Sequence, residues 1–343
     1  MSALLIVLGV LVLTVTGIDV LWTVLAAGSG AGPLTGRLSA LAWRVALVFG
    51  RRPSGPRHAL LAVSGIAIVV SMLLSWSGVT FGAWWLVASA SDGAVRVAES
   101  GAPADLLERA WFVGYNLFTL GSTTYTAGDG LWQLLPVVTG ASGLVLLTLG
   151  ISYLVPVASA VAERRQLAQY VVSLGSTPSL LLTRTWSGKG FDALAQHLTA
   201  LTPMVHLAGE RHLTYPALAY FHSGREQASS SISVVVLDEA VTLLRCGVAP
   251  EARPDPAVLD PIRSAIDMFL EIVGGAFVAH ETDPLPAPGL QVLREAGIPT
   301  VDDGDFGAAV GGEVRRRCLL AGLLLNDGWT PEHWARRREA LER

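Results

Sequence analysis

Three segments of the chain are almost wholly apolar, and each is long enough to cross a lipid bilayer. They run from Ala3 to Ala27, from Ala59 to Ser89 and from Leu131 to Ala162. A helix of about 20 apolar residues spans the hydrocarbon core of a membrane. The first segment lacks the basic start of a cleavable signal peptide. The sequence therefore predicts three transmembrane helices.

The composition of the whole chain is also typical of a membrane protein. Apolar residues make up 51% of the chain and charged residues 15%, with a mean hydropathy of +0.50. A soluble domain carries about 25% charged residues. The net charge of −4 is too small to indicate a nucleic-acid partner. Cys246 and Cys318 form no CxxC pair, and no GxGxxG segment is present, so we expect neither a metal-sulfur site nor a dinucleotide-binding domain. Because the sequence also shows no nucleophile elbow, phosphate loop or metal motif, we expect no enzyme activity, cofactor or metal site.

The charges between the apolar segments predict the orientation. Five arginines and no acid separate the first two segments: Arg37, Arg44, Arg51, Arg52 and Arg57. The next connection is rich in acids, namely Asp92, Glu99, Asp105, Glu108 and Asp129. Positive charge favours the cytoplasmic side. We therefore expect an outside N-terminus, a cytoplasmic C-terminal part and a location in the plasma membrane.

A short amphipathic segment and a polar loop precede the third apolar segment. Residues 105–118 are too short and too polar at their start to cross a bilayer. Residues 119–130 are rich in glycine and hydroxyl groups. Irregular backbone at membrane depth is tolerated only where it is buried in protein or lines water. This order predicts a re-entrant pore loop.

The order of outer helix, pore helix, loop and inner helix resembles the pore module of the potassium-channel superfamily. The selectivity filter of that family reads Thr-Val-Gly-Tyr-Gly-Asp, with an aromatic pair at the eighth and seventh residues before the threonine. Trp111 and Phe112 stand at this spacing before Thr119. The resemblance covers about residues 59–165 and implies four chains around one axis, with potassium as the permeating ion.

The resemblance also assigns roles to individual residues. Carbonyl groups of the filter replace the hydration shell of the ion. The implied filter residues are Thr119, Leu120, Gly121, Ser122 and Thr123, with the hydroxyl of Thr119 contributing. The implied support in the pore helix comes from Trp111, Phe112 and Tyr115.

The filter of this chain departs from the family pattern. Thr123 stands at the second glycine, Ser122 at the tyrosine and Thr124 at the aspartate. A glycine there allows positive φ, which a β-branched residue tolerates poorly. A second alignment places the filter at residues 124–129, but it loses the first glycine and the aromatic spacing. Both alignments stay open, as does a pore that is weakly selective or does not conduct.

Two further features of the membrane part carry alternative interpretations. Gly150 and Pro156 in the third segment mark either a gating hinge or simple close packing of helices. Asp19 lies inside the first segment, where a carboxylate is costly. In one interpretation the carboxylate pairs with an arginine such as Arg44 or is protonated. In the other it takes part in sensing.

The third part of the chain is predicted to be mainly helical and cytoplasmic. Segments 225–247 and 260–278 are helix-like, although Ile232 to Leu237 also fits a short strand, and Asp260-Pro261 starts or breaks a helix. His206, Glu210, His212 and His222 form only a loose cluster of possible metal ligands. The basic triplets 315–317 and 336–338 fit solvated helix faces, or contacts with anionic lipid or a partner.

These observations predict a mostly α-helical membrane protein. The expected parts are an N-terminal helix with a basic interfacial segment (1–58), a pore module (59–165) and a cytoplasmic domain (166–343). Within the pore module we expect the outer helix at 59–89, the pore helix at 105–118, the filter at 119–124 and the inner helix at 131–162. The predicted function is passive conduction of a monovalent cation by a homotetramer, with an unknown regulatory ligand possible on the cytoplasmic domain. The alternatives are a non-conducting or weakly selective membrane sensor or scaffold that keeps the pore fold, and a membrane-tethered enzyme that uses residues 206–222.

Overall fold

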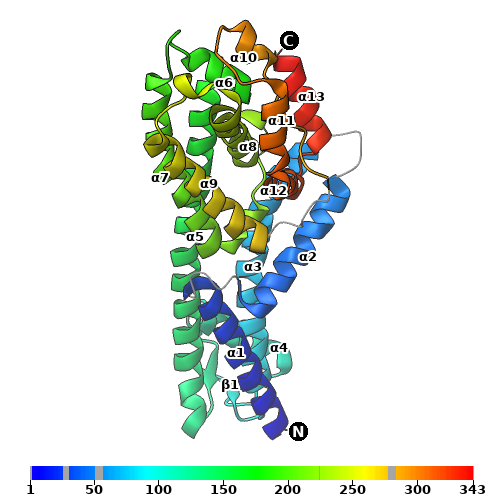
Figure 1. Cartoon of the computed structure of the whole chain (residues 1–343). Coiled ribbons are helices and arrows are strands. Elements are labelled where there is room, and N and C mark those ends of the chain that lie inside the picture. Colours follow the sequence, from blue (N-terminus) through cyan, green and yellow to red (C-terminus); the bar gives the residue numbers. More distant parts are fainter. Residues whose placement is uncertain (1, 26–30, 51–56, 224, 277–282, 343) are drawn as a thin grey trace. The chain divides into compact units, whose positions relative to one another are not determined.

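A computed structural model of the chain describes residues 2–25, 31–50, 57–223, 225–276 and 283–342. The described part is mostly helical, and its strands are two short segments. It divides into two compact units (Figure 1). The first unit comprises Met1–Ala27, Ala31–Leu41 and Ala67–Pro156, and the second comprises Gly28–Gly30, Ala42–Ile66 and Val157–Arg343.

Three helices have the length and composition of membrane spans, as the apolar segments predicted. They are α1 (Ser2–Leu25), α3 (Arg57–Ala88) and α5 (Leu134–Leu174). A fourth helix, α2 (Pro33–Gly50), follows α1 and carries Arg37 and Arg44 of the basic connection. Helix α5 has 41 residues and is about 62 Å long, roughly twice the hydrocarbon thickness of a bilayer. Its C-terminal part therefore belongs to the second unit and not to a span.

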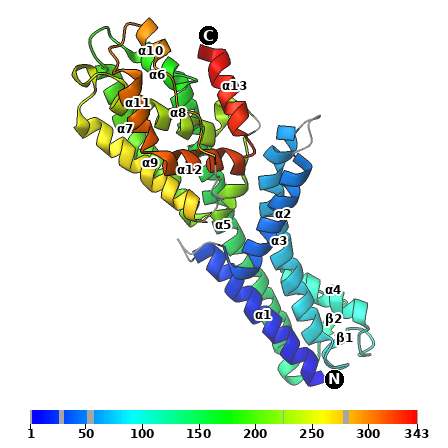
Figure 2. The ribbon, with the colours of Figure 1, turned by 45° about the vertical axis from the view of Figure 1, so that its right-hand side comes forward.

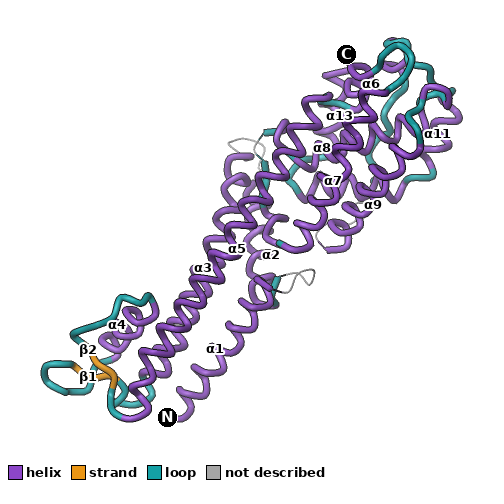
Figure 3. Tube along the Cα trace, turned by 90° about the vertical axis from the view of Figure 1, so that its left-hand side faces the viewer, coloured by secondary structure: helices purple, strands orange, loops and turns teal. Residues whose placement is uncertain are grey.

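In the first unit, the chain between α3 and α5 forms a short helix and a two-stranded sheet, which lie beside the ends of these helices (Figure 3). Helix α4 (Leu106–Leu117) starts with a capping box, in which Asp105 accepts from the Leu107 and Glu108 amides while Glu108 accepts from the Asp105 amide. Strand β1 (Val95–Val97) pairs antiparallel with β2 (Tyr125–Ala127). A 3₁₀ turn (Gly130–Gln133) then leads into α5. The sequence predicted α4 from its amphipathic pattern, and the structure adds the cap.

The second unit is a helical bundle built around α8 (Ser230–Thr242), all of whose residues are buried (Figure 2). The other helices that lie wholly within it are α6 (Pro178–Thr185), α7 (Asp192–Thr214), α9 (Pro256–Ala276), α10 (Gln291–Glu295), α11 (Asp303–Gly311), α12 (Val314–Asn326) and α13 (Pro331–Glu342). Helices α2, α3 and α5 each contribute one end to it. Single turns lie at Pro216–Tyr220, Glu226–Ala228, Leu243–Gly247 and Pro250–Ala252. The strand interpretation of Ile232 to Leu237 is wrong, because these residues form the middle of α8. An apolar run that is buried on all sides fits a central helix as well as a central strand.

Helix α9 also corrects an expectation. It begins at Pro256 and continues through Pro261, so Asp260-Pro261 neither starts nor breaks it. Its apolar face packs along α7 in the core of the second unit, where Ile262, Ile266 and Phe269 are buried. Burial of this face outweighs the single hydrogen bond that a proline removes.

The basic triplets form ion pairs within the second unit. Asp238 of α8 accepts from Arg263 and Arg316, and Glu239 pairs with Arg317 and Arg338. Both carboxylates are almost fully buried, at 1% and 0% exposure. Buried charges require such partners. Three of the triplet arginines therefore hold α12 and α13 against α8 and do not form solvated faces.

Candidate pore loop

A tight backbone turn follows the last residue of α4. The Thr119 amide donates to the Asn116 carbonyl at 2.9 Å, and the amides of Leu120 and Gly121 both donate to the Tyr115 carbonyl, at 2.8 and 3.2 Å. Thr119 has a φ of 58°, and among the described residues it is the one residue other than glycine with a positive φ. Gly121 has a φ of 70°. The backbone at two of the five predicted filter residues is therefore left-handed, and Thr119 adopts a conformation that its side chain disfavours.

The outer part of the loop leaves this conformation. Thr123 has no positive φ, in contrast to the glycine that the family pattern places there. The chain instead becomes extended: the Ala98 amide donates to the Thr124 carbonyl at 2.9 Å, and Thr126 lies opposite Arg96 in the strand pair. The backbone of residues 124–127 is thus hydrogen-bonded to β1 and to Ala98, the residue after it. This pairing favours the alignment of the filter at Thr119 over the alignment at 124–129.

The three predicted support residues of α4 divide into two groups. Phe112 is buried at 3% exposure in a small core with Val87, Val95 and Leu135. Trp111 and Tyr115 lie on the exposed face of α4, with stacked rings whose centroids are 5.4 Å apart. Phe112 therefore fixes α4 on its own chain, and the other two aromatic rings are available to a neighbouring molecule.

Glycines on α5 allow its close approach to the end of α4. A β-carbon added at Gly143 would overlap the backbone carbonyl of Leu117, and one at Gly140 would lie 3.3 Å from the carbonyl of Asn116. Gly150 plays the same part against α3, where an added β-carbon would lie 3.2 Å from the Leu73 side chain. These contacts support the close-packing interpretation of the glycines. Helix α5 continues without a break through Pro156, and its role as a hinge stays a prediction.

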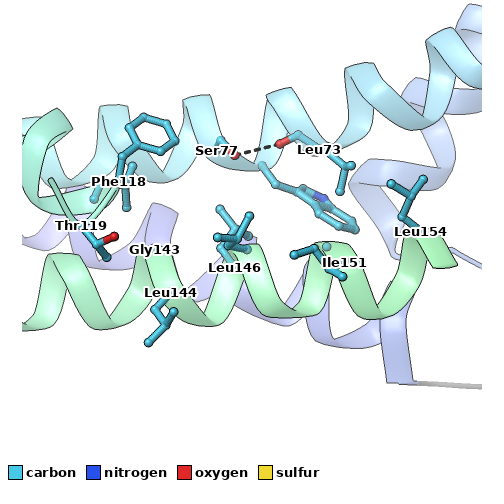
Figure 4. A pocket seen from close by; sticks show the side chains of 13 residues that line it. Leu73, Ser77, Phe118, Thr119, Gly143, Leu144, Leu146, Ile151 and Leu154 are labelled. Atoms are coloured by element: carbon cyan, nitrogen blue, oxygen red, sulfur yellow. Dashed lines mark hydrogen bonds between the residues drawn. The ribbon is translucent and has the colours of Figure 1, made fainter.

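An apolar cavity of about 180 Å³ lies beside the turn, within the first unit. Figure 4 shows Phe118 and Thr119 at one end and Leu154 at the other, with side chains of α3 and α5 between them. Its lining is almost entirely apolar. Thr119 is the predicted filter residue that lines it.

The predicted filter residues are largely open to solvent in the single chain. Leu120 is 71% exposed, and the residues around it are exposed as well, apart from the half-buried Ser122. An exposed leucine beside exposed aromatic rings on α4 is an unusual surface for a soluble protein.

A buried arginine on α4, for which the sequence carries no signal, ties this helix to the segments that precede it. Arg109 is 5% exposed, donates to the Ala104 carbonyl at 2.9 Å and pairs with Asp92 at 2.8 Å. The pairing connects α4 to the segment after α3. A basic residue in an amphipathic helix gives no local signal of such a distant partner.

Comparison with known proteins places this chain in a family. It is 34% identical over 319 residues to the uncharacterized membrane protein YdjJ of Bacillus subtilis (strain 168), covering 93% of this chain and 92% of that protein. The chain belongs to the YdjJ family. No family model matches it, and no solved structure matches it. The relative's description and the three apolar helices together indicate a membrane location.

In this member of the YdjJ family, Asp19 caps a helix. Its carboxylate accepts from the amides of Leu34 and Thr35, at 2.8 and 3.3 Å, and from the Thr35 hydroxyl. The indole nitrogen of Trp76 donates to the same hydroxyl at 2.9 Å. The start of α2 carries the positive end of the helix dipole, which stabilises a carboxylate. The charge of Asp19 is thus balanced by backbone amides; the side chain of Arg44 lies outside the described residues.

The histidine cluster does not form a metal site in the described part of this YdjJ-family chain, which holds no group of three possible ligands. The His212 ring lies 3.0 Å from the Ala208 carbonyl, and burial together with Arg164 lowers the pKa of His212 to about 3. His222 lies against the carbonyl and carboxylate of Asp327. His212 is therefore neutral at physiological pH.

Proposed function

We propose that this chain is one subunit of a pore-loop cation channel in the plasma membrane, with potassium as the first candidate ion. The observation that carries the proposal is the capped helix α4, which ends in a turn with positive φ at Thr119 and Gly121 and is packed against glycines of α5. Such irregular backbone beside apolar helices needs either protein or water around it.

The chemistry of the proposed filter is dehydration of the ion by fixed oxygens. The carbonyls of Thr119, Leu120, Gly121 and Ser122 and the hydroxyl of Thr119 are the candidate ligands, with Thr123 at the outer end. Monovalent cations bind such rings of carbonyl groups in place of water. One loop supplies a quarter of a ring, so the proposal requires four chains around an axis.

A second candidate function is a membrane sensor or scaffold that keeps the pore fold and is weakly selective or does not conduct. The conformation of residues 123–127 supports it. Because Thr123 lacks positive φ and β2 pairs with β1, fewer carbonyls are free to line the outer filter than in the family pattern. Cation flux into liposomes that contain the purified protein distinguishes the two functions.

The Gly121→Ala variant should lose cation flux. An alanine strains the backbone at a φ of 70°, while the space around the residue is open. The matched control is Gly101→Ala, which imposes the same strain at a φ of 66° outside the filter and should conduct normally. Reversal potentials under potassium and sodium gradients give the readout. Normal conduction by Gly121→Ala would move the filter to residues 124–129.

Wild-type protein should discriminate weakly between potassium and sodium, and the double variant Thr123→Gly with Thr124→Asp should prefer potassium more strongly. The glycine permits the positive φ that Thr123 lacks, so the outer carbonyls can turn toward the ion. The same bi-ionic measurement tests this. A sharply potassium-selective wild type would show that the argument from Thr123 is wrong.

The purified protein should have the mass of four subunits in detergent. The exposed Trp111, Tyr115 and Leu120 provide apolar surface for contacts between copies. Native mass spectrometry measures the subunit number directly. A stable monomer or dimer would leave the loop without a pore and would favour the sensor or scaffold.

A reporter that is active only in the cytoplasm should be active when it is fused after Arg343. The expectation follows from the arginines between α1 and α3, which favour the inner side of the membrane. Paired cytoplasmic and extracytoplasmic reporters at this position give opposite signals. Activity of the extracytoplasmic reporter would invert the proposed orientation.

A further inference from the structure

A second cavity, of about 520 Å³, lies within the second unit, and nothing in the proposed pore uses it. Three arginines line it: Arg164 and Arg165 from the C-terminal part of α5, and Arg225 from the segment before α8. Apolar side chains, those of Ile66, Val161 and Phe221, form another part of the wall. The cavity is therefore amphipathic and carries an excess of positive charge.

Arg164 is held in place by neutral groups. Its guanidinium donates to the Leu218 carbonyl through Nη1 and to the Ser230 hydroxyl through Nε and Nη2, at 3.1 and 2.8 Å for the hydroxyl contacts. In the described part of the chain it has no carboxylate within ion-pair distance. The hydrogen-bond partners of this partly buried arginine are all neutral, and Asp327 acts on it only from beyond ion-pair distance, which favours the approach of an anion.

The other two arginines are exposed at the cavity wall. Among the described residues, the side chains of Arg165 and Arg225 have neither an ion pair nor a hydrogen bond. Asp327 is the acid that lines the cavity, and its carboxylate already accepts from Ser229 at 3.0 Å and lies 3.6 Å from His222. One acid faces three arginines, so the local charge is positive.

The start of α8 adds to this field. Ser230, the first residue of this helix of 13 residues, lines the cavity, and Ser229 caps the helix through the Ile232 amide. The first turn of a helix has amides without helical acceptors and carries the positive end of the helix dipole. Arginines beside a helix start form a common arrangement for binding phosphate.

We propose that this cavity binds the phosphate group of an anionic ligand whose apolar part contacts Ile66, Val161 and Phe221. The phosphate lies between Arg165 and Arg225, and Arg164 is preorganised beneath it by Leu218 and Ser230. The group is carried either by a soluble phosphate compound or by an anionic lipid headgroup.

The test uses the full chain in detergent and two probes at constant ionic strength: inorganic phosphate, and mixed micelles that contain phosphatidylglycerol with phosphatidylcholine micelles as reference. The tested variant is Arg165→Gln with Arg225→Gln. The matched control is Arg184→Gln with Arg315→Gln, which removes the same charge from two exposed arginines elsewhere in the second unit. The unfolding temperature is followed by tryptophan fluorescence during titration of each probe.

We expect saturable stabilisation of wild-type protein and of the control by at least one probe. The tested variant should need at least about tenfold more probe, because it loses two charge-assisted contacts. A response to inorganic phosphate identifies a soluble ligand, and a response to phosphatidylglycerol alone identifies a lipid. The proposal is overturned if neither probe stabilises wild-type protein or if the two variants respond alike.

Discussion

Replacing Gly143 with alanine should destabilise the first unit and abolish any ion flux. The new methyl group would overlap the backbone carbonyl of Leu117, which cannot rotate away as a flexible side chain could. Overpacking of this kind costs about 1–3 kcal/mol. It would also move the end of α4, from which the turn at Thr119 starts. Thermal stability in detergent, measured by size-exclusion chromatography after heating, gives the first readout, and liposome flux gives the second.

Gly78→Ala is the matched control for this experiment. Gly78 lies on α3 with open space at the position of its β-carbon. An alanine there should stabilise the helix by about 0.5–1 kcal/mol because it lowers the entropy of the unfolded chain. If Gly143→Ala withstands heating as well as wild-type protein, the close packing of α5 on α4 is wrong.

The Glu239→Gln variant should unfold the second unit at a much lower temperature. The substitution keeps the shape of the side chain, but Arg317 and Arg338 lose the carboxylate that they share. The side chain of residue 239 is fully buried, so water cannot replace that carboxylate. Removing one partner of a buried ion pair costs about 3–5 kcal/mol. For a unit of this size, that corresponds to a drop of roughly 10 °C in the unfolding temperature. Near-ultraviolet circular dichroism of the full chain in detergent records the transition.

The same charge change at an exposed ion pair provides the control. Asp260 pairs with Arg245, and its side chain is 63% exposed. Asp260→Asn should change the stability by less than about 1 kcal/mol, because solvent screens exposed pairs. The buried Glu239 differs from this exposed control: burial raises the pKa of its carboxyl group, whereas the charges of Arg338 and Arg317 act to lower it. Equal unfolding temperatures for Glu239→Gln and wild-type protein would show that the ion pairs around α8 do not hold the bundle together.

The two proposals concern different parts of the chain and can fail separately. The pore proposal depends on the turn after α4 and on the assembly of four copies. The phosphate site depends on Arg164, Arg165 and Arg225 in the second unit. Loss of phosphate binding without loss of flux, or the reverse, therefore tests each one independently.

Several features of the fold were predictable because their causes are local. The three long helices follow from apolar segments that only a helix can carry across a bilayer. Helix α4 follows from Asp105 and Glu108, which cap it within one turn. Its amphipathic pattern and the polar residues after it also predicted the loop that follows α4. Each of these signals lies within a few residues of the structure that it produces.

Other features depended on partners far away in the sequence. The run Ile232 to Leu237 fits a strand or a helix, and only the surrounding helices made it the buried centre of α8. The positions of Arg316 and Arg338 gave no sign of Asp238 and Glu239 as partners, because ion pairs across a bundle have no fixed spacing.

The sequence by itself thus determined which segments are membrane helices and where the loop between them lies. The tertiary structure decided how the polar groups are used: Asp19 caps α2, Thr126 pairs with Arg96 of β1, and Arg164 lines a cavity with neutral hydrogen-bond partners. The physical reason is the range of the interactions. Hydrophobic length and capping act along the chain, whereas the partner of a buried charge is set by whichever residue the packed helices bring within about 3 Å.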